Sequence, residues 1–263
     1  MAWLTSLPVW VLVVGSLAIA LAVAGASRLA VAAIVPAGEA DHVAAIAAPL
    51  MPALGAAFAV LTALTLASEA GYLRTAQDTV SHEAAEASRL AWASTSPEVD
   101  SGPIQDALAD YLRTTRANEW RGADDDEQAD AATTDAIAAL EVAVRTEAAR
   151  SELGTPASTE LLASLDAVTV GRRTRIAAAA RQLPGLYVAT IVVSGAALVA
   201  NAGALTFRSS RRTSLLVAGL ACVVGLSLAL LLAIAAPWDG GLVATGDPID
   251  AVVVDIESGF FTP

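Results

Sequence analysis

The sequence contains no lysine, one cysteine and few aromatic residues. All 15 basic residues among its 263 are arginines, and 27 acidic residues bring the formal net charge to −12. This acidic balance argues against nucleic acid as a partner. The single cysteine, Cys222, excludes an intrachain disulfide and a metal centre built on several thiolates. Because Cys222 lies in an apolar stretch, we interpret it as a small packing residue.

Charged side chains are also missing from four long stretches, residues 1–27, 43–68, 182–207 and 213–238. Each stretch holds the roughly 20 apolar residues that a membrane-spanning helix needs. A cleaved signal peptide is the alternative for the first stretch, but no basic segment precedes its apolar core and three further stretches follow it. We therefore expect an all-α membrane protein with four transmembrane helices in the lipid bilayer.

The charge lies mainly between the second and third apolar stretches. Residues 69–182 hold 20 acidic residues against 11 arginines. We expect a first transmembrane hairpin (1–68), an acidic helical domain outside the membrane (69–182), a second hairpin (183–238) and a C-terminal tail (239–263). The tail alternates weakly in polarity, which predicts a short extended segment packed on the membrane face or on a neighbouring subunit.

Apolar residues recur at helical spacing through the acidic domain and predict four helical pieces. The first continues the second span to about Trp92, and the others cover 103–121, 134–153 and the residues from about 157 to the third span. The acidic run at 122–130 is predicted to be a solvated linker. Gly154 and Pro156 mark the end of the third piece.

The second span carries a polar stripe. Its members recur every three or four residues and so share one helix face: Gly55, Phe58, Thr62, Thr65 and Glu69. Such a stripe either lines water or forms hydrogen bonds within the helix bundle. Pro52 removes the hydrogen bond to the Ala48 carbonyl and predicts a kink.

Two helices of the acidic domain are predicted to be joined by ion pairs. At helical rise, Glu83 lies ~22 Å beyond the membrane boundary, while Arg175 and Arg172 lie ~12 and ~16 Å from it. Arg172 continues an apolar stripe and needs a carboxylate if it is buried. We expect Glu83 or Glu86 to pair with Arg172 or Arg175, with Glu119 as the alternative acceptor. Trp120 is predicted to pack the helical domain closed.

Four blocks resemble one family of proteins. They are EAAEASRL at 83–90, DYLRTTRANEW at 110–120, GRRTRIAAAARQLPGLY at 171–187 and APWDGG at 236–241. Their order and spacing are similar to those of the bestrophin-like family of bacterial membrane proteins. The last block usually reads Pro-Phe-x-Gly in that family, and Trp238 keeps an aromatic ring at the second position.

The resemblance implies a function as well as a topology. True bestrophins are pentameric ion channels in which the second membrane helix lines the pore. By this resemblance the present chain has four spans in the bacterial plasma membrane, with both termini and a helical domain in the cytoplasm. The candidate pore-lining residues are then Phe58, Leu61, Thr62, Thr65 and Glu69. A ring of Glu69 carboxylates favours cations, whereas most bestrophins pass anions. Either Glu69 faces away from the pore, or the protein is not an anion channel.

A non-conducting sensor or scaffold subunit of a larger membrane complex is the alternative to a homo-oligomeric channel. An enzyme is not expected, because His42 and His82 lie far apart and no catalytic triad, metal-binding helix or phosphate loop is present. For the same reason we expect no cofactor and no metal. Arginine counts do not decide the orientation, since four lie near one side of the predicted spans and five near the other.

Overall fold

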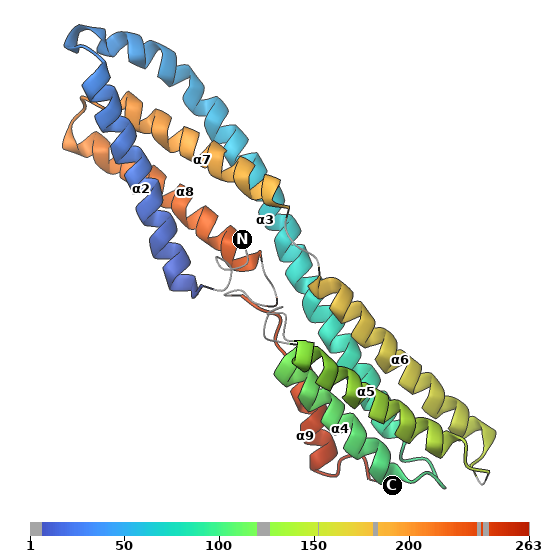
Figure 1. Cartoon of the computed structure of the whole chain (residues 1–263). Coiled ribbons are helices and arrows are strands. Elements are labelled where there is room, and N and C mark those ends of the chain that lie inside the picture. Colours follow the sequence, from blue (N-terminus) through green and yellow to red (C-terminus); the bar gives the residue numbers. More distant parts are fainter. Residues whose placement is uncertain are drawn as a thin grey trace. The chain divides into compact units, whose positions relative to one another are not determined.

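The computed structural model describes residues 7–119, 127–151, 153–180, 184–235, 238 and 242–262. Within these ranges the chain forms eight α-helices and one short 3-10 turn, with no strand (Figure 1). The prediction of an all-α chain is confirmed. The helices are α2 (Val9–Ile34), α3 (Ala40–Ala93), α4 (Ser101–Asn118), α5 (Glu127–Ala148), α6 (Thr155–Ala179), α7 (Gly185–Leu205), α8 (Arg211–Ile234) and α9 (Asp247–Glu257).

The chain divides into two compact units. Unit 1 comprises Met1–Tyr72, Gln182–Ala236 and Gly240–Leu242, and unit 2 comprises Leu73–Arg181, Pro237–Asp239 and Val243–Pro263. Helix α3 therefore contributes its first part to unit 1 and its second part to unit 2. Unit 1 holds α2, α7 and α8, while unit 2 holds α4, α5, α6 and α9.

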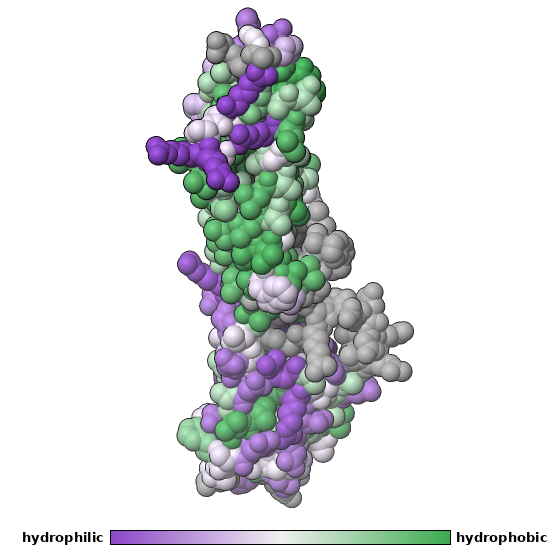
Figure 2. Space-filling model, turned by 90° about the vertical axis from the view of Figure 1, so that its left-hand side faces the viewer, coloured by the Kyte–Doolittle hydropathy of each residue, from purple (hydrophilic) through white to green (hydrophobic). Residues whose placement is uncertain are grey.

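Four of the described helices are long and apolar enough to cross a membrane: Val9–Ile34, His42–Ala93, Gly185–Leu205 and Arg211–Ile234. On the face of the molecule drawn in Figure 2, hydrophobic residues cover a broad area. Helix α3 has 54 residues. It is therefore ~81 Å long, and only part of it fits within a hydrocarbon core of about 30 Å.

Glycines set the packing distances in unit 1, where α2 lies against α7 and α8 (Figure 1). A Cβ atom on Gly203 of α7 would lie 2.6 Å from the carbonyl oxygen of Ala24. A Cβ atom on Gly225 of α8 would lie 3.0 Å from the Cα atom of Leu17. Such direct backbone contact at small residues is typical of helix packing in membranes.

Unit 2 has an apolar core to which every one of its helices contributes. The predicted inward stripes are buried: Ile104, Leu108, Tyr111 and Leu112 on α4, Ile137, Leu140 and Val144 on α5, and Leu161, Leu165 and Val168 on α6. Helix α5 begins at Glu127, so the end of the predicted linker is helical.

The C-terminal tail is helical, and the prediction of an extended segment is wrong. Pro248 stands in the first turn of α9, where a helix tolerates its missing N–H group. The buried residues Ile249, Val252 and Val253 follow helical spacing, and the weak alternation noted in the sequence left out Val252. The tail packs within unit 2 on α4, and the Gln105 side chain there donates a hydrogen bond of 2.9 Å to the carbonyl oxygen of Phe261.

Candidate functional site

Two glutamates and two arginines form a buried ion network in unit 2. Glu83 on α3 is fully buried and Arg175 on α6 is 1% exposed. Nε of Arg175 donates to Oε2 of Glu83 over 2.5 Å, and its Nη2 donates to Oε2 of Glu119 over 2.5 Å. Nη2 of Arg172 donates to the other oxygen of Glu119 over 2.8 Å. The four charges therefore compensate one another and join α3, the end of α4 and α6.

A glycine allows α6 to approach α3 at this network. A Cβ atom on Gly171 would lie 3.2 Å from the Cα atom of Glu83, closer than ordinary contacts between side chains and backbone. Arg175 follows Gly171 by four residues and so lies on the same face of α6. The close approach at Gly171 therefore places the guanidinium of Arg175 against the carboxylate of Glu83.

Tyr111 of α4 completes the network, and its hydroxyl donates to Oε1 of Glu83 over 2.5 Å. Burial and then the charge of Glu83 raise the pKa of Tyr111 above its ordinary value, so the hydroxyl keeps its proton. Burial lowers the pKa of Arg175, but the carboxylates of Glu83 and Glu119 outweigh it and raise that pKa overall. Arg175 therefore stays charged.

Six residues were predicted to join the helices of this domain or pack it closed, and the structure brings together four of them: Glu83, Glu119, Arg172 and Arg175. Glu86 lies elsewhere, because its carboxylate faces His82 and Arg89 on its own helix, at 3.9 and 4.0 Å. Trp120 lies outside the described residues. Tyr111 was not predicted as a hydrogen-bond donor to this network. An inward-facing tyrosine needs a hydroxyl partner, which was the available signal.

The predicted pore-lining stripe of α3 mostly faces the interior of unit 1. Phe58, Thr62 and Glu69 are only 6%, 8% and 4% exposed. The ring of Phe58 lies so close to α7 that a Cβ atom on Gly195 would be 3.0 Å from it. Leu61 and Thr65 are half-buried, and the Thr65 hydroxyl donates to the Leu61 carbonyl.

The opposite face of this part of α3 is open in the subunit and carries many small residues beside larger ones such as Val60, which is 57% exposed. Its small members are all exposed, among them Ala45, Ala48, Pro49, Pro52, Ala56, Ala63 and Ala67. Both prolines lie inside the continuous helix. Because proline has no N–H group, Pro49 and Pro52 leave the carbonyl oxygens of Ala45 and Ala48 without their helical donors.

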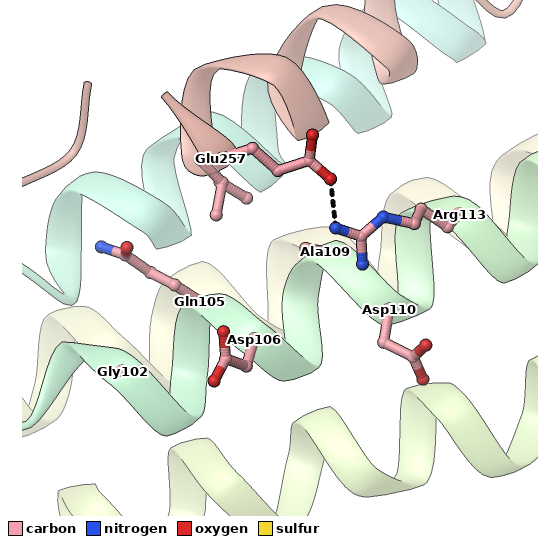
Figure 3. Close-up of a pocket in the computed structure, with 8 residues that line it drawn as sticks. Gly102, Gln105, Asp106, Ala109, Asp110, Arg113 and Glu257 are labelled. Atoms are coloured by element: carbon pink, nitrogen blue, oxygen red, sulfur yellow. Dashed lines mark hydrogen bonds and ion pairs between the residues drawn. The ribbon is translucent and has the colours of Figure 1, made fainter. Parts of the chain in front are cut away.

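Unit 2 also has a groove of about 540 Å³ between α4 and α9. Figure 3 shows Arg113 of α4 meeting the carboxylate of Glu257 of α9 at this groove. Asp106 and Asp110 add two further carboxylates to its lining, so negative charge prevails there. Among the described residues, no group of three or more His, Cys, Asp or Glu side chains is placed to hold a metal ion.

A comparison with protein families matches a model described as a bestrophin-like domain to residues 18–249. The matched range takes in most of α2, all of α3 to α8 and the buried ion network. No match was found among curated proteins or among solved structures.

Proposed function

The chain belongs to the bestrophin-like family of membrane proteins, and from that premise we propose that it is an ion channel built from several copies of itself. In this proposal α3 lines the pore, and the pentamer of true bestrophins is the assembly that the family implies. Unit 2 is proposed to form the domain between the two hairpins and to lie in the cytoplasm of a bacterial cell with both termini.

The sidedness of α3 is the observation that supports this proposal. One side packs into unit 1 through Phe58 and Thr62, and the other side is open. A passage between copies must be lined by a surface that the single subunit leaves open. The open side of α3 meets that condition, and the side that carries Glu69 does not. We therefore assign the pore lining to residues 45–67 of the open side.

The two freed carbonyl oxygens of Ala45 and Ala48 favour water beside this surface. A backbone polar group without a partner costs several kcal/mol in hydrocarbon, and irregular backbone in membranes is tolerated where it lines water or is buried in protein. Facing lipid is therefore the least favourable position for this part of α3. A water-filled passage supplies the missing donors.

The same oxygens favour cations over anions. Carbonyl oxygens carry partial negative charge and replace water molecules around a cation in channels. The open side of residues 45–67 has no charged side chain that would oppose this preference. We propose a cation-conducting pathway and place Glu69 outside its lining.

A non-conducting scaffold subunit is the second candidate. Small residues such as Ala56 and Ala63 allow close packing against a helix of another protein, and donors of that helix can satisfy the carbonyls of Ala45 and Ala48. This candidate predicts a heteromeric complex with no water path along α3.

The native mass of the purified protein in detergent separates the two candidates. A channel built from identical copies predicts a whole-number multiple, above one, of the chain mass of 26.6 kDa. A monomer that gains mass only with a second protein would support the scaffold and contradict the channel.

The proposed topology predicts opposite accessibility for two engineered cysteines. In a Cys222→Ala background, Ser210→Cys lies in the α7–α8 turn and Asp135→Cys on the exposed side of α5. A membrane-impermeant thiol reagent applied to intact cells should label Ser210→Cys, while Asp135→Cys should react only after the membrane is opened. Labelling of both in intact cells would rule out the four-span topology.

A further inference from the structure

Four arginines gather at one end of unit 1, where the α7–α8 turn meets the last part of α2. Arg208, Arg211 and Arg212 are exposed, and Arg28 comes from α2. The guanidinium of Arg28 donates to the hydroxyl of Ser214 and, over 3.1 Å, to the carbonyl oxygen of the turn residue 209. These contacts hold the charge of Arg28 beside the turn.

The positive charge of this cluster is not neutralised within the described part of the chain. No described carboxylate lies within ion-pair distance of its four guanidiniums, whereas six arginines of unit 2 are paired. Glu39, in the 3-10 turn that follows α2, is among these unpaired carboxylates. The cluster therefore attracts anions locally.

An apolar strip follows the cluster along α8, on the helix face that carries Arg212. Leu216, Gly219, Val223 and Leu226 follow Arg212 at intervals of four, three, four and three residues, so they share its helix face. Leu216 is 75% exposed, Val223 60% and Leu226 48%. A Cβ atom placed on Gly219 would meet nothing within 4 Å beyond its chain neighbours and its own helical turn, which leaves open space in the middle of the strip.

We propose that this surface binds an anionic phospholipid. Guanidiniums bind phosphate oxygens through paired hydrogen bonds, and the first turn of α8 adds backbone N–H groups that point toward the cluster. The lipid phosphate lies among Arg28, Arg208, Arg211 and Arg212, and an acyl chain lies along the strip. A free phosphate satisfies the arginines but makes no use of the apolar strip, so the occupant that fits both parts is a lipid.

Native mass spectrometry of the full chain in detergent tests this proposal, with phosphatidylglycerol and phosphatidylcholine of identical acyl chains as probes. The wild type should retain phosphatidylglycerol in preference to phosphatidylcholine. Replacement of Arg208, Arg211 and Arg212 by glutamine should lower phosphatidylglycerol retention at least about tenfold. The control triple variant Arg89→Gln, Arg145→Gln and Arg173→Gln removes the same charge from exposed positions of unit 2 and should retain the lipid like the wild type.

Three outcomes would overturn the proposal. They are equal retention of the two lipids, equal loss in both triple variants, and displacement of phosphatidylglycerol by inorganic phosphate at the same concentration. If the arginine-cluster variant does not fold, a sodium chloride titration of the wild type decides. Retention of phosphatidylglycerol that falls with salt supports the site, and retention that is independent of salt contradicts it.

Discussion

Replacement of Arg175 by methionine is expected to lower the free energy of unfolding of unit 2 by about 3 to 5 kcal/mol. Arg175 is the only guanidinium in contact with Glu83 among the described residues, and Glu83 is fully buried. Its removal leaves a buried carboxylate whose remaining described partner is the hydroxyl of Tyr111. Chemical denaturation of the purified protein in detergent, followed by circular dichroism, measures the loss.

A double-mutant cycle shows whether the two side chains act together. Glu83→Gln removes the buried negative charge, so the double variant of Glu83→Gln and Arg175→Met should lose less stability than the sum of the two single losses. Little coupling is expected between Arg89 and Glu160, which also join α3 to α6 but are 52% and 46% exposed. Removal of that exposed pair should cost at most about 1 kcal/mol. Strictly additive losses of unfolding free energy for Glu83→Gln and Arg175→Met would show that this ion pair does not join α3 to α6.

Replacement of Ala56 by tryptophan is expected to abolish ion conduction while leaving the fold intact. Ala56 is exposed in the middle of the open side of α3. In a channel between copies, several indole rings at this level would fill the passage and exclude water. Ion flux into liposomes that contain the purified variant measures the effect.

A matched control separates blockage from a general effect of tryptophan. Val193 is 66% exposed on α7, a helix that the proposal places outside the pore lining. Val193→Trp should therefore conduct better than Ala56→Trp. Normal flux through Ala56→Trp would show that α3 does not line the pore.

The double variant Pro49→Ala and Pro52→Ala restores the helical N–H donors to the carbonyl oxygens of Ala45 and Ala48. Its preference for cations over anions should therefore fall.

The contact between Glu83 and Arg175 could be anticipated from the sequence, because helical rise and the apolar stripe of α6 restrict where these side chains can meet. Which glutamate binds which arginine could not be anticipated from the sequence. Glu119 binds both arginines because the end of α4 comes against α6, and this depends on tertiary packing. Glu86 is one turn from Glu83, and spacing along one helix does not tell which carboxylate faces the partner helix.

The face of α3 that packs into unit 1 was not predictable from its own residues. Polarity left open whether Thr62 faces water or the helix bundle, and the resemblance placed Thr62 and Glu69 at the pore, but both are covered within unit 1. Small residues on α7, such as Gly195, admit the ring of Phe58 and so select the packed side. The tail was misjudged for a related reason, since a short amphipathic segment fits a strand or a helix until its partner surface is known.

Ion flux through the purified wild-type protein is the most direct test of the proposed function. The protein is placed in liposomes that contain no other protein, and the uptake of a monovalent cation is followed after a concentration gradient is imposed. We expect uptake that rises with the amount of protein and exceeds that of chloride. Absence of uptake by a protein that retains its fold and a homo-oligomeric native mass would contradict the channel.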